Sequence, residues 1–148
     1  MMKYLQKLGK AIMLPVAVLP VAAIMMGIGY AMCPATMQGG DVTGIIQIIG
    51  FALAKIGSAV IDKLPMLFAV GVAIGLSKDQ HGAAGLAGLV AFLTVTTVLN
   101  SGVVATMMGA EEAPLAFSKI DNAFIGIISG ITASVCYNKF SSAQLPTA

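Results

Sequence analysis

The stretch AIMLPVAVLPVAAIMMGIGYAMCPATMQGG, from Ala11 to Gly40, decides the fold class of this chain because it contains no charged side chain. A helix needs about 20 apolar residues to cross the roughly 30 Å hydrocarbon core of a bilayer, and residues 11–32 supply them. Lysines at positions 3, 7 and 10 precede the stretch, as in a secretory signal peptide. The apolar region of a signal peptide is only about 7–15 residues long, so we expect a retained membrane helix.

The composition of the whole chain agrees with a membrane protein. Of the 148 residues, 58% are hydrophobic and 9% are charged, and the mean hydropathy is +0.96, whereas a soluble domain carries roughly 25% charged residues. The net charge of +2 and the scattered lysines lack the basic face that nucleic-acid binding requires. Neither a phosphate-binding loop nor a zinc-ligand spacing occurs, so we expect no catalytic residue, cofactor or metal. Cys33 and Cys136 are expected to be small buried apolar residues.

Uncharged runs mark the other candidate spans. We expect crossings at residues 11–32, 64–77, 82–108 and 122–138. Residues 43–61 carry Lys55 near their centre, and a lysine at mid-bilayer costs roughly 2.5–3.5 kcal/mol. Either Lys55 faces a wet or protein-lined interior, or this helix lies in the interface with Lys55 reaching outward. Apolar residues recur at helical spacing here, which favours the interfacial amphipathic helix.

Lysines concentrate on cytoplasmic connectors of membrane proteins, and this rule orients the expected spans. Four crossings place the N-terminal lysines, Lys78 and Lys139 in the cytoplasm, and they place Asp41, Glu111 and Glu112 outside. The expected fold class is therefore all-α, a polytopic transmembrane helix bundle of about four to five membrane segments, in which residues 43–61 are counted as the interfacial helix.

Prolines and glycines predict how the helices bend and pack. Pro15 and Pro20 should interrupt the first span, because proline lacks the amide hydrogen that a helix needs. The pairs Gly71/Gly75 and Gly126/Gly130 have the small-xxx-small spacing that lets two helices approach closely.

Few polar residues are candidates for a binding site. Thr94, Thr96, Thr97 and Asn100 lie near one end of the third expected crossing. They either hydrogen-bond between helices, which we favour, or line a path for a polyol. Thr94, Thr97 and Asn100 are the candidate substrate-binding residues. His81 and the pair Glu111 and Glu112 are interpreted as solvated connector residues.

Three stretches resemble one known family. Residues 5–29, LQKLGKAIMLPVAVLPVAAIMMGIG, look like the opening of the sugar-permease domain (enzyme IIC) of the bacterial phosphoenolpyruvate-dependent phosphotransferase system, in its glucose and N-acetylglucosamine branch. Residues 63–94 resemble that family's LP-x-L-F-A-x-G-V-A-x-G-L segment and its following helix. Residues 122–140, NAFIGIISGITASVCYNKF, resemble its G-I-x-x-G-x-x-A-x-x-Y-N-K/R-F segment.

The resemblance implies a multi-pass permease of the bacterial inner membrane that binds a sugar, carries it across and presents it to a IIB domain for phosphorylation. Residues 1–148 correspond to the N-terminal part of such a domain, so the IIB domain and the C-terminal half of IIC are absent. In the family the sugar-holding histidine and glutamate come from that second half, and His81 does not match them. The resemblance also implies a homodimer whose interface includes the early helices.

The stretch IDNAF, residues 120–124, resembles the N-acetylglucosamine group of the family more than the glucose group, and this resemblance favours N-acetylglucosamine over glucose. The alternative function is a non-transporting membrane scaffold that needs a complementary half. A small pore is a third possibility, which the sparse intramembrane charge argues against.

Overall fold

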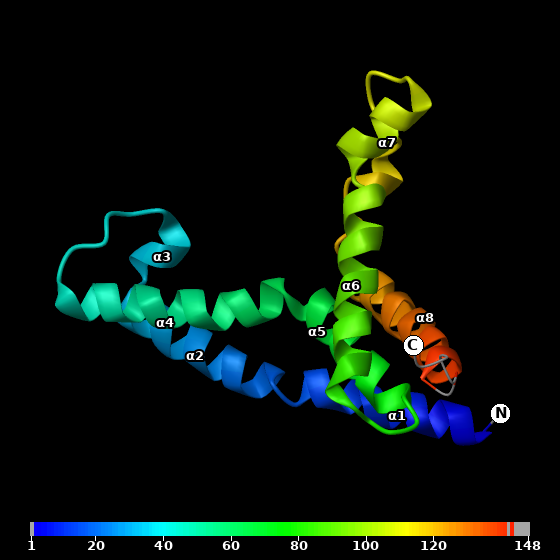
Figure 1. The fold of residues 1–148 in the computed structure, drawn as a ribbon. Coiled ribbons are helices and arrows are strands. Elements are labelled where there is room, and N and C mark those ends of the chain that lie inside the picture. The colour runs from blue at the N-terminus through cyan, green and yellow to red at the C-terminus, as the bar shows by residue number, and fades with distance from the viewer. Residues whose placement is uncertain (1, 142, 144–148) are drawn as a thin grey trace, which may run out of the picture. The chain divides into compact units, whose positions relative to one another are not determined.

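The computed structural model describes residues 2–141 and 143, and every regular element in that part of the chain is a helix (Figure 1). The expected all-α fold is confirmed. The elements are α1 (Met2–Val16), α2 (Leu19–Met32), α3 (Ala35–Gln38), α4 (Ile45–Asp62), α5 (Leu64–Leu76), α6 (Gly82–Val98), α7 (Ser101–Met108), the 3-10 turn η1 (Leu115–Phe117) and α8 (Ala123–Phe140).

Three helical stretches are long and apolar enough to cross a membrane, namely Met2–Met32, Ile45–Asp62 and Ala123–Phe140. A fourth span is possible if α6 and α7, which are bent by 53° at a short break, cross together. The crossings expected at 11–32, 82–108 and 122–138 coincide with these stretches. The one expected at 64–77 is the 13-residue helix α5, which at 1.5 Å per residue is shorter than the hydrocarbon core.

The first span is interrupted where the prolines predict it. Helix α1 ends at Val16 and α2 begins at Leu19, with Pro20 in the first turn of α2. Proline is tolerated in the first turn because its missing amide would have no partner there.

The chain divides into two compact units, which are considered separately. Unit 2 comprises residues 15–64, and unit 1 comprises residues up to 14 together with those from 65 onward. In unit 2, α2 and α4 pack as antiparallel neighbours. Gly57 lies against Ala22, near the start of α2, and Gly50 lies against Met32 at its end. The absence of side chains at these glycines lets the two backbones touch.

This pairing bears on where α4 lies in the membrane. The sequence favoured an interfacial helix, but α4 is packed against α2 from one end of α2 to the other. By length and composition, α4 is itself apolar enough to cross a membrane. Lys55 lies over the ring of Phe51, 5.4 Å from its centroid, an arrangement that is favourable for an ammonium group. Lys55 is exposed in unit 2, and the place of α4 in the membrane stays a prediction.

In unit 1, the short helix α5 packs against three others. A Cβ built on Gly88 of α6 would lie 2.5 Å from the carbonyl oxygen of Ala69, and one built on Gly130 of α8 would lie 2.7 Å from the same oxygen. Ala11 of α1 touches Gly75. The buried residues of this core are Ala11, Phe68, Ala69, Val72, Ala73, Leu76, Ala84, Phe92 and Ala133. The predicted packing role of Gly126 and Gly130 is confirmed, since both lie against α5.

The directions of these helices follow from the same contacts. Gly126 lies against Pro65 and Gly130 against Ala69, so α5 and α8 are parallel. Gly85 lies against Ile74 and Gly88 against Ala69, so α6 is antiparallel to α5. The C-terminal ends of α5 and α8 consequently meet the N-terminal end of α6.

Two glycines of α2 allow a matched test of the hairpin. A Cβ at Gly29 would lie 2.6 Å from the carbonyl oxygen of Gly50 and 2.8 Å from the Cα of Ala54, whereas a Cβ at Gly27 would meet nothing within 4 Å. We expect Gly29→Ala to lower the free energy of unfolding in detergent by about 1–3 kcal/mol through overpacking. Gly27→Ala should leave it unchanged or raise it by up to about 1 kcal/mol through helix propensity. Equal effects of the two substitutions would contradict the α2–α4 packing.

Candidate functional site

Polar contacts join the connector between α5 and α6 to the end of α8. The side chain of Asn138 accepts a hydrogen bond from the backbone amide of Lys78 at 2.8 Å and donates one to the carbonyl of Leu76 at 3.1 Å. The last carbonyls of a helix have no partner within the helix, so Asn138 caps α5 from a different helix. This contact holds the ends of two parallel helices at one level.

Tyr137 adds a second contact to the same connector. Its hydroxyl donates a 2.9 Å hydrogen bond to a carboxylate oxygen of Asp79. This bond is the main reason why the pKa of Asp79 lies below its ordinary value, and the backbone amide of His81 lowers that pKa further. A carboxylate with a lowered pKa stabilises the folded state above its ordinary pKa, and this contribution disappears as the pH falls through the lowered value.

His81 has a structural role that the sequence analysis missed. Its Nδ1 accepts a hydrogen bond from the amide of Ala83 at 3.2 Å and so caps the N-terminus of α6. The preceding residue, Gln80, has a φ of +52°, which non-glycine residues rarely adopt. The connector is thus held by contacts on both sides.

The residues that the sequence singled out lie in the last turns of α6 and in the break between α6 and α7. Asn100 begins α7, and its side-chain oxygen accepts the amide of Gly102 at 3.0 Å. The hydroxyl of Thr94 donates to the carbonyl of Val90 at 2.8 Å, and that of Thr96 donates to the carbonyl of Phe92 at 2.9 Å. Such bonds to the preceding turn bend helices. These two hydroxyls therefore contact their own helix instead of a neighbouring one.

The broken span offers polar groups beyond those side chains. Where a helix is interrupted, backbone amides and carbonyls become available at membrane depth, and this is tolerated only where they line a cavity or are covered by protein. Thr94, Thr97 and Asn100 are exposed in unit 1. The alternative in which they line a polyol path stays a prediction.

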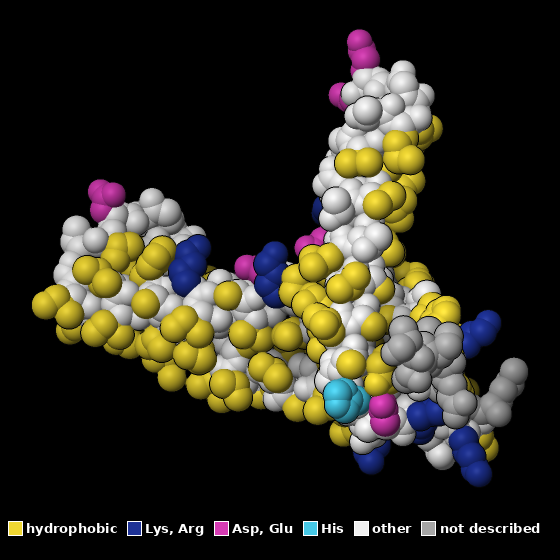
Figure 2. Space-filling view, viewed as in Figure 1, with side chains coloured by type: hydrophobic (Ala, Val, Ile, Leu, Met, Phe, Trp, Pro, Cys, Tyr) yellow, Lys and Arg dark blue, Asp and Glu magenta, His cyan; other side chains and the backbone are white. Residues whose placement is uncertain are grey.

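The far end of α7 carries acidic residues. Glu111 and Glu112 border a polar hollow of about 280 Å³ together with Ser101, Gly102, Ala105 and Ala113. This end of unit 1 lies at the opposite end of the α6–α7 pair from His81. Figure 2 shows dark-blue lysine side chains and one acidic side chain near the single histidine, and acidic side chains at the tip of α7. Asp79 lies at the lysine-bearing end and Lys119 follows Glu111 and Glu112 in the chain, and the orientation that the positive-inside rule predicts stays a prediction.

An apolar groove of about 560 Å³ runs between α6 and α8. Small side chains form much of its floor, among them Ala83, Ala87 and Ala91 on α6 and Ala133 on α8.

Cys136 also lines the groove and is exposed, so the expectation that it is buried is wrong, whereas Cys33 is buried as expected. Both thiols are free. Among the described residues, no three His, Cys, Asp or Glu side chains form a group that could hold a metal ion.

The Tyr137–Asp79 contact predicts a change in a measurable titration. Tyr137→Phe removes the hydrogen bond, so the pKa of Asp79 should rise towards its ordinary value. Selective carbon-13 labelling of aspartate in the detergent-solubilised chain, followed by a pH titration, measures this change. Tyr30→Phe is the matched control and should leave that pKa unchanged. An Asp79 pKa that is the same in both variants would contradict the contact.

Comparison with known proteins places the chain in a family. The family described as "Phosphotransferase system, EIIC" matches residues 9–148. The "PTS system N-acetylglucosamine-specific EIICB component" of Bacillus subtilis (strain 168) is 37% identical over 148 residues, which cover 99% of this chain and 26% of the relative. The "PTS system glucose-specific EIICBA component" of Staphylococcus saprophyticus is 34% identical over 158 residues, covering 97% of this chain and 22% of the relative.

The chain therefore spans about a quarter of the length of these curated relatives. The resemblance found in the sequence is confirmed over nearly the whole chain. The matched range includes α2 to α8, and with them the broken span, the connector and the apolar groove. The chain belongs to the EIIC family of the phosphotransferase system.

Proposed function

We propose that residues 1–148 act as the N-terminal part of an EIIC sugar permease in the bacterial inner membrane. The permease moves a hexose or N-acetylhexosamine across the membrane, coupled to phosphorylation of the sugar. The observation that carries this proposal is the family match over residues 9–148. Both relatives are named for a sugar and for an EIIC part joined to an EIIB part, and the apolar helices fit a membrane location.

We favour N-acetylglucosamine over glucose as the sugar. The IDNAF stretch supports this choice, and so does the slightly higher identity to the relative named for N-acetylglucosamine, 37% against 34%. In the structure, Asn122 of this stretch caps α8 by accepting the amide of Ile125 at 3.0 Å. Because that side chain has a capping role, the preference is carried by the resemblance and the relatives and not by a sugar contact.

We propose that the broken α6–α7 span forms this chain's part of the sugar path. Transporters commonly place substrates at discontinuous helices, where helix ends present free backbone groups. Thr94, Thr97 and Asn100 border the break and are exposed in unit 1. We propose that Thr97 and Asn100 face the sugar and that Thr94, whose hydroxyl contacts Val90, mainly shapes α6.

The proposed partners are a IIB domain, the remaining half of EIIC and a second copy of the permease. Many large apolar side chains are exposed, including Ile45, Ile46 and Met107, and the groove between α6 and α8 is floored by small residues. Small residues are typical of helix–helix contacts in membranes. These surfaces support a role inside a larger helical assembly. The scaffold alternative shares this assembly but involves no sugar contact.

A chimera tests the proposed function. Residues 1–148 replace the matching part of the Bacillus subtilis EIICB relative, and membranes containing the chimera are supplied with the soluble phosphocarrier proteins and radiolabelled sugar. We expect phosphorylation of N-acetylglucosamine that depends on phosphoenolpyruvate, and less phosphorylation of glucose. Phosphorylation that continues without phosphoenolpyruvate would contradict the proposal.

Two variants of the chimera separate the permease from the scaffold. Thr97→Val and Asn100→Ser each remove polar groups at the break, and loss of a hydrogen bond worth about 1 kcal/mol should raise the KM for the sugar about fivefold. Thr132→Val is the control, since the Thr132 hydroxyl donates to Ile128 in its own helix. If all three variants keep the KM of the parent chimera, the proposed sugar contacts of Thr97 and Asn100 are contradicted and the scaffold function is favoured.

A further inference from the structure

A small cavity lies where α1 meets the α5–α6 connector. Its volume is about 150 Å³, and its walls are Lys7, Lys10, Ala11, Gly75 and Gln80. The close contact of Ala11 with Gly75 brings α1 to this position. Pockets for drug-sized ligands measure about 300–1,000 Å³, so this cavity suits a small group instead of a whole sugar.

The walls of the cavity combine two lysines and a glutamine with apolar surface. Lys7 and Lys10 come from α1, and Gln80 comes from the connector. Lys3 and Gln6 extend the same basic face into a neighbouring hollow that Lys7 and Lys10 also line. Asp79, the acidic residue next to Gln80, is held by Tyr137 and by the amide of His81. Gln80 takes up its rare positive φ at this point, and strained residues cluster at functional sites.

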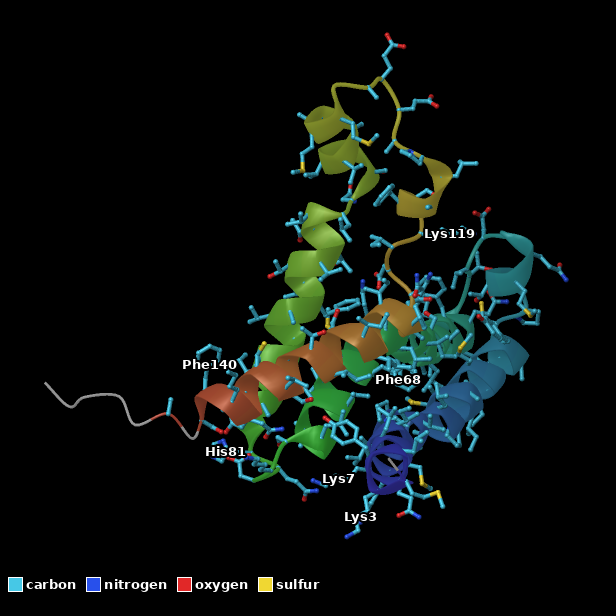
Figure 3. The ribbon with its side chains drawn as sticks, turned by 90° about the vertical axis from the view of Figure 1, so that its right-hand side faces the viewer. Lys3, Lys7, Phe68, His81, Lys119 and Phe140 are labelled. Atoms are coloured by element: carbon cyan, nitrogen blue, oxygen red, sulfur yellow. The ribbon has the colours of Figure 1, made fainter. Side chains whose placement is uncertain are left out.

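The depth of the cavity relative to the membrane follows from α1. Lys10 is the last charged residue before the uncharged run from 11 to 40, so the cavity lies where hydrocarbon gives way to headgroups. At 100° per residue, Leu5 and Ile12 fall on the face of α1 opposite the lysines, and Leu5 is 66% exposed. A basic face backed by an exposed apolar face is typical of helices that bind anionic lipid surfaces. Figure 3 shows Lys3 and Lys7 at the same end of unit 1 as His81.

We propose that Lys7, Lys10 and Gln80 bind the phosphate group of an anionic phospholipid in the leaflet on the lysine side of the membrane. The two ammonium groups attract the single negative charge of the phosphate group, and the Gln80 amide donates a hydrogen bond to it. A phosphorylated protein would offer the same charge, but it would not cover the exposed apolar face of α1. The site is independent of the sugar path, so its test can fail while the proposed transport function stands.

Lipid retention measures this site directly. The full chain is reconstituted in vesicles of phosphatidylcholine and phosphatidylglycerol (3:1), extracted in mild detergent and examined by native mass spectrometry. We expect the wild-type chain to keep phosphatidylglycerol in preference to phosphatidylcholine. A lysine near anionic lipid contributes about 1 kcal/mol, or about fivefold, so Lys7→Gln with Lys10→Gln should weaken phosphatidylglycerol binding about 30-fold. Gln80→Gly, which relieves the positive φ and removes the amide, should weaken it about fivefold.

Three further arms complete the experiment. Lys7→Arg with Lys10→Arg keeps the charge and should keep the lipid, which also shows that α1 tolerates substitution. Lys63→Gln with Lys119→Gln removes the same net charge elsewhere and should keep the lipid. An equal loss in this control would overturn the proposal in favour of non-specific attraction. Displacement of the lipid by millimolar inorganic phosphate would overturn it in favour of a free-anion site.

Discussion

The arrangement of unit 1 depends on backbone-to-backbone contact at Ala69. Gly88 of α6 and Gly130 of α8 both lie against its carbonyl oxygen, and neither glycine has a side chain to hold the helices apart. In a bilayer, lipid is as apolar as leucine, so helices associate through close packing and not by escaping from solvent. A short helix, α5, can therefore set the level and the direction of two longer neighbours.

The functional features follow from those directions. Because α5 and α8 are parallel and α6 is antiparallel to both, the ends that carry Lys78 and Lys139 lie together, and Asn138 can cap α5. The same arrangement brings the connector to α1 and forms the cavity of Lys7, Lys10 and Gln80. It also sends the bent α6–α7 pair towards the opposite end, where the break at Asn100 exposes polar groups. The packing of α6 and α8 against Ala69 thus places the lysine-bearing end and the break at Asn100 at different ends of α6.

The sequence predicts what depends on local composition, and it misses what depends on a distant partner. Uncharged runs locate the helices, Pro15 and Pro20 mark the interruption of the first span, and Gly130 signals close packing. The contact of Tyr137 with Asp79 joins residues 58 positions apart, so no local pattern reveals it. The pairing of α4 with α2 through Gly50 and Gly57 was likewise not readable, because it joins residues of two helices that no local pattern connects.

The separation of the lysine-bearing and acidic ends across the membrane is the claim on which the account rests. It is tested most directly with single cysteines in a chain whose Cys33 and Cys136 are replaced by serine. Lys78→Cys and Glu111→Cys are each treated with a membrane-impermeant maleimide on intact cells. The account predicts that Glu111→Cys is labelled at once and Lys78→Cys only after the membrane is permeabilised. Labelling of both positions from the same side would contradict it.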